Sequence, residues 1–243
     1  MPESRHIVAI GGGGFADTSS NFAIDAYILS LARNRHPRVG LIPTATGDDS
    51  RQLSVFMAAY GGLDCRPGYL PLFSRTPELA RWVFEQDVIF VGGGNTLSML
   101  AVWKAWGLDQ LLPEALARGT VLAGQSAGAI CWFEQGVSDS WAGSLRALDC
   151  LGLLPGSCCP HYASEAQRKP IFRKLVQEGD MQAGIAIDDG AAVHFVDGKL
   201  TRVLSWRKGA TAYHVEKGTG SQVCEEPIEP EKLNPLIPDW PVR

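Results

Sequence analysis

The first half of the chain repeats one unit, in which a short apolar run ends at a turn and a helical pattern follows. Predicted strands cover residues 6–10, 38–42, 69–73, 87–91 and 120–123. Predicted helices cover residues 21–33, 51–60, 77–84, 108–118 and 126–133, and one more ends near residue 106. Strands alternating with helices indicate βαβ units around a parallel sheet. Right-handed crossovers place the glycine-rich turns at the carboxyl ends of the strands, where α/β proteins build their sites.

The pattern changes after residue 139. Residues 155–160 are predicted to form a loop, residues 170–177 a short amphipathic helix, and residues 184–216 three short strands with Asp-Gly turns at 189–190 and 197–198. Because no linker intervenes, we interpret these strands as an antiparallel completion of the same unit. The sequence therefore predicts one α/β domain over residues 1–243, ending in a loosely structured, proline-rich tail from about residue 225 to 243.

Composition excludes several classes of protein. With 45% hydrophobic residues the chain is too apolar for disorder, and a net charge of −4 argues against a nucleic-acid binder. Its apolar runs are strand-sized, well short of the roughly 20 residues that span a bilayer, and no signal peptide is evident. The six cysteines lack CxxC spacing and are expected to be reduced. Cys158 and Cys159, just before His161, lack a second half-site. We therefore expect a cytoplasmic protein without metal, cofactor or membrane partner.

Three glycine-rich turns compete as functional sites. Residues 11–16 formally satisfy the dinucleotide pattern GxGxxA, but the second strand ends without the acid that binds ribose. We interpret this segment as a tight turn that lets the backbone approach another loop or a ligand. The turn at residues 92–94 gains meaning only beside the third, at residues 124–128.

That third turn, Gly124-Gln125-Ser126-Ala127-Gly128, fits the G-x-S-x-G pattern between a predicted strand and a predicted helix. Glycine is needed on both sides because the serine occupies a sharp bend, where a neighbouring Cβ would clash with the strand or the helix. The helix start provides a free N–H group, that of Ala127, toward an oxyanion. Ser126 is therefore predicted to be a nucleophile.

A serine nucleophile needs a base and an orienting acid. Of the five histidines, His161 lies in a loop beyond the predicted elbow helix and is the favoured base. His6, His36, His194 and His214 are interpreted as surface or structural residues. The acids that follow Ser126 leave three alternatives, Asp139, Asp188 and Asp189.

The segment Phe90-Val91-Gly92-Gly93-Gly94-Asn95-Thr96, the elbow Gly124-Gln125-Ser126-Ala127-Gly128 and Pro160-His161-Tyr162 occur in that order. Together they resemble the peptidase E (α-aspartyl dipeptidase) and cyanophycinase family of serine peptidases, from about residue 6 to residue 196. The resemblance implies a three-layer α/β sandwich with a mostly parallel sheet, of the class I glutamine-amidotransferase-like (flavodoxin-like) type. It also implies a triad in the chain order Ser, His, acid.

The resemblance implies a role for individual residues. Ser126 corresponds to the nucleophile and His161 to the general base. The family's acid lies in a short turn before a strand, which favours Asp189, one methylene shorter than the usual glutamate. Asp139, thirteen residues after the serine, is the runner-up acid.

Further roles follow from the same resemblance. Gly94 would provide the second oxyanion N–H beside that of Ala127, and Asn95 would cap the following helix. In the aspartyl dipeptidases, an arginine after the histidine motif holds the substrate aspartate. Its counterpart here is Arg168, with Arg173 as the runner-up. Arginine suits this role because its guanidinium group pairs in bidentate fashion with a carboxylate.

The sequence thus predicts a serine peptidase that acts on short peptides, with Asp-X dipeptides as the leading substrates. Two alternatives are a serine peptidase with non-acidic specificity and a ligand-binding relic of the same fold without turnover. Amidotransferase chemistry is disfavoured because that class carries cysteine at the elbow, where this chain has Ser126. The oligomeric state stays open, a homodimer included.

Overall fold

The computed structural model describes residues 4–17, 21–220 and 222–236. The helices are α1 (Ala23–Ser30), α2 (Ser50–Gly61), α3 (Leu79–Phe84), α4 (Thr96–Trp106), α5 (Leu108–Ala117), α6 (Ala127–Ile130) and α7 (Arg168–Glu178). The strands are β1 (His6–Ile10), β2 (Arg38–Ile42), β3 (Arg66–Tyr69), β4 (Val88–Val91), β5 (Val121–Gln125), β6 (Phe133–Ser138), β7 (Arg146–Asp149), β8 (Leu154–Cys159), β9 (Gly184–Ile187), β10 (Ala191–Val196), β11 (Lys199–Ser205), β12 (Ala212–Lys217), β13 (Val223–Ile228) and β14 (Glu231–Lys232).

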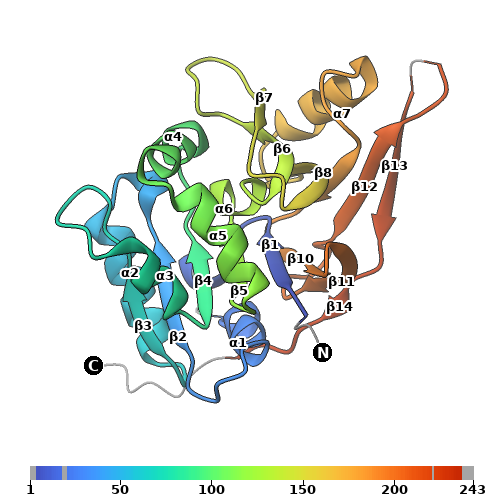
Figure 1. Cartoon of the computed structure of the whole chain (residues 1–243). Coiled ribbons are helices and arrows are strands. Elements are labelled where there is room, and N and C mark those ends of the chain that lie inside the picture. Colours follow the sequence, from blue (N-terminus) through green and yellow to red (C-terminus); the bar gives the residue numbers. More distant parts are fainter. Residues whose placement is uncertain (1–3, 18–20, 221, 237–243) are drawn as a thin grey trace.

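The larger sheet has eight strands in the order β14-β11-β10-β1-β5-β4-β2-β3 (Figure 1). Within this sheet the adjacent strands β1, β5, β4, β2 and β3 run parallel to one another, and β10 pairs with β1 in the antiparallel direction. The βαβ pattern of the first half therefore forms the parallel part of one sheet. This arrangement confirms the predicted fold class, an α/β sandwich with a mostly parallel sheet.

Strand β1 shows how the sequence divides the interior into two layers. Ile7 and Ala9 pack in a cluster with buried residues of α3, α4 and α5, whereas Val8 and Ile10 pack with buried residues of α1 and α2. Successive side chains of a strand point to opposite faces, so a run that is apolar at every position needs cover on both sides. Helices on both faces of the sheet provide that cover and make the three layers.

A second sheet of six strands, in the order β13-β12-β9-β8-β6-β7, was not predicted. Its strand β8 occupies Leu154–Cys159, where the sequence predicts a loop at residues 155–160. The loop was predicted because proline usually interrupts a strand. Here Pro155 lies near the start of β8 and Pro160 follows its end, two positions at which a strand tolerates proline. Helix α7 packs on this sheet through Phe172 and Val176.

The late strands also divide between the sheets. β10 and β11 extend the larger sheet, whereas β9 and β12 pair with each other in the second sheet. Residues 184–216 were predicted to form three short strands, whereas the structure has four, which are divided between two sheets. Local alternation identifies a strand but does not record which sheet it joins.

Smaller differences concern element ends. The elbow helix, predicted to reach residue 133, ends at Ile130 because β6 begins at Phe133. The strand predicted at 69–73 lies at Arg66–Tyr69. The tail predicted to be loose from residue 225 contains β13 and β14, while residues 237–243 lie outside the described residues. Among the described helices, none is long and apolar enough to cross a membrane.

Candidate active site

Ser126 occupies the bend between β5 and α6, with φ 54° and ψ −114°. A Cβ atom on Gly124 would lie 2.3 Å from the carbonyl oxygen of Gly128, and one on Gly128 would lie 2.2 Å from that of Val91. Both glycines are therefore required by close backbone contacts, as the G-x-S-x-G pattern predicts. A positive φ on a non-glycine residue stores strain, which clusters at functional sites.

His161 lies beside Ser126, just after β8, and also has a positive φ of 56°. Its Nε2 atom is 2.8 Å from the Oγ atom of Ser126. The N–H of Tyr162 donates to the carbonyl oxygen of Ile187 at 3.2 Å, which joins this turn to the end of β9. The second sheet thus brings the histidine to the carboxyl end of β5.

Asp189 completes the arrangement from the turn between β9 and β10. Its Oδ1 atom is 2.7 Å from Nδ1 of His161, and the hydrogen bond from His161 lowers the pKa of this carboxyl group. Asp189 is therefore ionised and can only accept, so Nδ1 of His161 carries the proton and Nε2 is free to accept from Ser126. The three side chains form a continuous relay.

The other two acids lie elsewhere. Asp188 is buried and turns away from His161, with Oδ2 accepting from the N–H of Thr211 at 3.2 Å and the hydroxyl of Tyr213 at 3.4 Å. Burial raises its pKa. Asp139 is largely exposed and lies 3.7 Å from Nη2 of Arg168. Neither hydrogen bonds to His161 in the described structure.

The glycine turn after β4 lies against the serine. A Cβ atom on Gly93 would be 3.2 Å from Cβ and 3.7 Å from Oγ of Ser126, whereas one on Gly94 would be 2.3 Å from the carbonyl oxygen of Ala45. Gly93 thus lies against the hydroxyl-bearing side chain, while Gly94 lies against the turn after β2. Sequence analysis proposed only Gly94 as the second oxyanion donor, because the pattern does not distinguish neighbouring glycines in a run.

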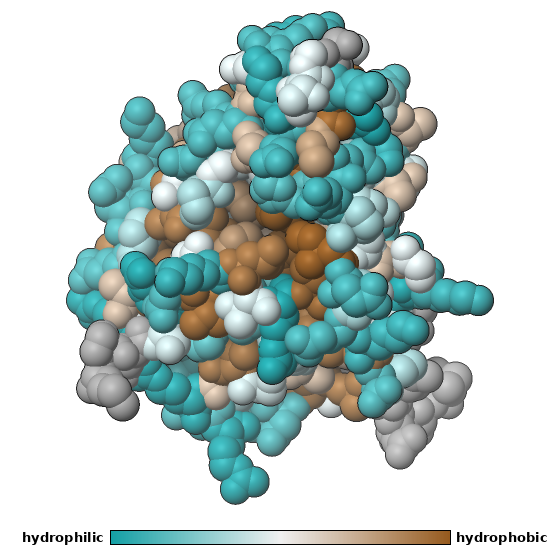
Figure 2. Space-filling view, turned by 90° about the vertical axis from the view of Figure 1, so that its right-hand side faces the viewer, coloured by the Kyte–Doolittle hydropathy of each residue, from teal (hydrophilic) through white to brown (hydrophobic). Residues whose placement is uncertain are grey.

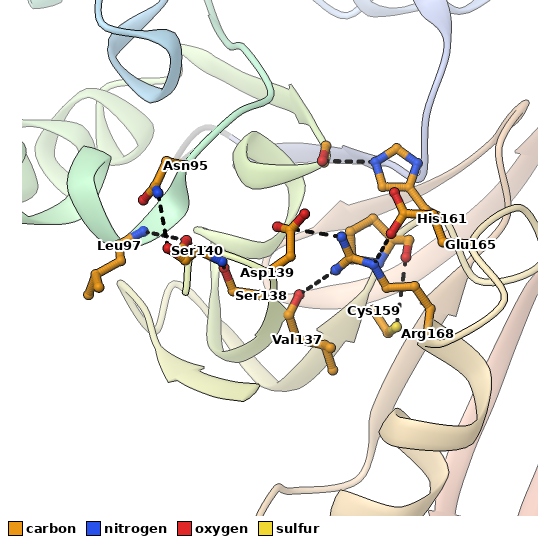
Figure 3. A network of polar contacts seen from close by, with 12 residues as sticks. Asn95, Leu97, Val137, Ser138, Asp139, Ser140, Cys159, His161, Glu165 and Arg168 are labelled. Atoms are coloured by element: carbon orange, nitrogen blue, oxygen red, sulfur yellow. Dashed lines mark hydrogen bonds and ion pairs between the residues drawn. The ribbon is translucent and has the colours of Figure 1, made fainter. Parts of the chain in front are cut away.

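Asn95 begins α4 and ties it to the β6–β7 connection. Its Oδ1 atom accepts from the N–H of Ser98 at 2.9 Å, so the predicted capping role is confirmed. Its Nδ2 atom donates to the carbonyl oxygen of Ser140 at 3.2 Å (Figure 3). This bond holds the segment that carries Asp139 near the glycine turn.

The first glycine turn approaches another loop closely, as the sequence predicts, and that loop is the one that carries Asp189. The N–H of Ser126 donates to the carbonyl oxygen of Ile10 at 3.2 Å, and the N–H of Gly190 donates to that of Gly12 at 2.8 Å. A Cβ atom on Gly12 would lie 2.9 Å from Cε1 of His161. The turn at residues 11–14 therefore lies against His161 and the acid turn, while the end of β1 just before it binds the backbone of Ser126.

Arg168 is 3% exposed, at the start of α7 (Figure 3). Its Nε donates to Glu165 at 2.6 Å and its Nη1 to the carbonyl oxygen of Val137 at 2.8 Å. Its Nη2 faces Asp139 across 3.7 Å. The guanidinium is thus buried behind two carboxylates. Arg173 pairs with Glu225 instead, at 3.2 Å.

A cavity of about 470 Å³ lies in front of this group of charges and is lined in part by Asp139, Trp141, Leu145 and Glu165. The N–H of Glu165 donates to the carbonyl oxygen of His161 at 3.0 Å, so the cavity adjoins the relay. Within the described residues, no three His, Cys, Asp or Glu side chains form a metal-binding group.

Comparison with known proteins agrees with this geometry. The profile of peptidase family S51 matches residues 7–203. A Bacillus subtilis protein named as the uncharacterized peptidase YgaJ is 48% identical over 212 residues, which cover 87% of this chain and 92% of that protein. Peptidase E of Shewanella sp. strain W3-18-1 is 27% identical over 178 residues, 67% of each chain.

Solved structures support the fold. The structure of a peptidase from an acI-B1 actinobacterium has a TM-score of 0.69 at 17% identity, covering 95% of this chain and 96% of that one. A Listeria monocytogenes protein has a TM-score of 0.63 at 22% identity, covering 84% and 100%. The profile match over most of the chain and the relative at 48% identity show that the chain belongs to peptidase family S51 and is a serine-type peptidase.

Proposed function

We propose that this peptidase cleaves short peptides through a triad of Ser126, His161 and Asp189. The observation that carries the proposal is the relay of 2.8 Å from Ser126 to His161 and 2.7 Å from His161 to Asp189. Nucleophile and base within hydrogen-bond reach, with the base oriented by a third group, is the arrangement that nucleophilic catalysis requires.

In the proposed reaction, Nε2 of His161 takes the proton of the Ser126 hydroxyl as Oγ attacks the scissile carbonyl carbon. The C–N bond breaks when the imidazolium of His161 returns that proton to the leaving amine, which leaves an acyl-enzyme. Water then attacks the ester carbonyl, with His161 again accepting and donating the proton. Ionised Asp189 stabilises the imidazolium in both steps.

The oxyanion would be bound by the N–H of Ala127 at the start of α6 and by an N–H of the glycine turn at residues 93–94. Each preorganised donor typically contributes about 3 kcal/mol to lowering the barrier. The family resemblance implies Gly94 as the second donor, and the contact of Gly93 with Ser126 makes Gly93 the competing donor.

The Asp-X specificity predicted from the sequence depends on Arg168. A substrate aspartate would have to approach a guanidinium that is 3% exposed, already donates to Glu165 and Val137, and faces Asp139. Asp139 and Glu165 are the more exposed charges beside the cavity, and they would repel a carboxylate. This observation favours the second candidate, a serine peptidase without acidic preference.

Hydrolysis of Asp-X, Ala-X, Leu-X and isoaspartyl dipeptides by the wild type and Ser126→Ala tests both candidates. Ser54→Ala, an exposed serine on α2, is the matched control. We expect cleavage that is abolished by Ser126→Ala and retained in the control. Cleavage of Asp-X alone would restore the acidic specificity, and cleavage that persists without Ser126 would contradict the proposed nucleophile.

Fluorophosphonate labelling separates the peptidase from a binding relic. A serine activated by His161 reacts with this reagent, whereas an unactivated hydroxyl does not. We expect labelling of Ser126 in the wild type and none in His161→Ala.

A further inference from the structure

A second cavity, of about 590 Å³, lies on the side of the molecule where β11, β12, β13 and β14 meet. Its walls come from the β11–β12 connection, the end of β13 and the segment around β14, and none of the relay residues lines it. Its volume falls within the range typical of small-molecule sites, about 300–1,000 Å³.

The walls of this cavity are mostly apolar. Trp206, Ala210, Ile228 and Leu233 line it. Figure 2 views this side of the molecule and shows hydrophobic surface gathered near the centre of the face, surrounded by hydrophilic residues. Contiguous apolar surfaces rimmed by polar residues are typical of ligand-, protein- and membrane-binding sites.

Three prolines in the cavity wall affect which kind of apolar ligand the cavity can bind. Pro227, Pro230 and Pro235 all line the cavity. Proline has no N–H, so each of these positions lacks a main-chain donor that could pair with the backbone of a bound peptide. The walls therefore suit a hydrocarbon chain better than a peptide strand.

The charges among the lining residues are mainly positive. Arg207, Lys208 and Lys232 stand against the single carboxylate of Glu229, in a chain whose net charge is −4. Arg207 pairs with Asp17 at 2.9 Å, whereas Lys208 and Lys232 are exposed. Ammonium groups at the edge of an apolar cavity complement an anion at one end of an apolar ligand.

We propose that this cavity binds a carboxylate with an unbranched apolar tail. The hydrocarbon occupies the space between Trp206, Ile228 and Leu233, and the carboxylate lies at Lys208 and Lys232. Burying methylene groups provides the affinity, and the lysines select the sign of the headgroup.

Residues of the cavity wall also hydrogen bond to the turn at residues 188–190, which carries Asp189. The N–H of Trp206 donates to the carbonyl oxygen of Gly190 at 3.0 Å, and the N–H of Asp188 donates to that of Thr211 at 3.0 Å. A ligand in the cavity would thus contact Trp206 and Thr211, whose backbones hydrogen bond to the residues on either side of Asp189. The binding proposal itself does not depend on catalysis.

Titration of the full chain with decanoate by isothermal calorimetry tests the proposal, with decylamine, decan-1-ol and an acetylated tetraleucine peptide as comparison ligands. We expect decanoate to bind one to one and more tightly than the other three. Lys208→Glu/Lys232→Glu should weaken binding at least tenfold. Lys104→Glu/Lys174→Glu, which changes the net charge equally at exposed sites on α4 and α7, should not.

A narrowing variant, Ile228→Trp, should also abolish decanoate binding, and circular dichroism will check that it folds. Equal binding of decanoate and decylamine, preference for the peptide, or binding insensitive to the lysine substitutions would each overturn the proposal.

Discussion

A Cβ atom on Gly12 would lie 2.2 Å from Oδ1 of Asp189, the atom that accepts the hydrogen bond from His161. Residue 12 and residue 189 also form a parallel bridge between the two turns. The backbone of the first glycine turn is therefore the surface against which the acid of the relay rests, and only glycine leaves room for it.

Gly12→Ala should consequently displace Asp189 and lower kcat. A displacement of about 1 Å in a catalytic group commonly costs about 100-fold in rate. We expect a fall of that order in kcat, with a smaller change in KM because the residue contacts the relay rather than the cavity beside Glu165. Steady-state kinetics on a cleaved dipeptide measures both.

Gly61→Ala is the control for that substitution, since its Cβ would meet no atom within 4 Å. An unchanged kcat in Gly12→Ala would contradict the inference that the space left by Gly12 fixes the position of Asp189 needed for catalysis.

The role of Gly12 also shows where prediction from sequence ends. The elbow around Ser126 could be predicted because its strand, turn and helix are contiguous, so local sterics fix the geometry. The contact of Gly12 with Asp189 joins residues far apart in the sequence. It follows from β10 pairing with β1, a long-range choice that the local pattern does not encode.

Asp189→Asn should lower kcat by roughly 10⁴-fold, because the amide can donate to Nδ1 and so favours the wrong tautomer of His161. Asp139→Asn removes a carboxylate that faces Arg168 and has no hydrogen bond to His161 in the described structure, and we expect less than a tenfold effect on kcat. The pair of variants, assayed on the same peptide, identifies the acid of the triad. A larger loss in Asp139→Asn would reverse the assignment.

Asp25 predicts a pH dependence of stability. It is fully buried on α1, and its Oδ1 accepts from the hydroxyl of Tyr60 at 2.9 Å and the N–H of Phe15 at 3.3 Å. Burial raises its pKa from 3.8 to about 7, so the folded chain holds a proton that the unfolded chain releases. The stability that this proton provides is complete below about pH 4 and is lost as pH rises through about 7.

Asp25→Asn keeps an oxygen acceptor and cannot ionise, so it should remove this dependence. From pH 4.5 to pH 7.5, the free energy of unfolding of the wild type should fall relative to that of Asp25→Asn by on the order of 3 kcal/mol. Urea unfolding at both pH values measures the difference. Burial lowers the pKa of His194 to about 4, which acts in the opposite direction but cancels between the two proteins.

Arg168 shows a second limit of the sequence. Its position after the histidine motif matches that of a substrate-binding arginine, but the spacing of a motif does not indicate whether the arginine side chain is buried. Three neighbours decide its environment, namely Val137 from β6, Asp139 from the segment after it, and Glu165 from the turn before α7. Bringing them together requires the second sheet, which the sequence did not predict.

Glu165→Gln tests whether carboxylates mask this arginine. The amide oxygen can still accept from Nε of Arg168, so the guanidinium keeps its place while one negative charge beside the cavity disappears. The ratio of kcat/KM for Asp-X to that for Leu-X should then rise about fivefold, a modest change because Glu165 is 46% exposed and its field is screened. Glu178→Gln, exposed at the end of α7, makes the same change in net charge and should leave the ratio unaltered. A ratio equal in both variants would mean that the cavity beside Arg168 does not receive the substrate side chain.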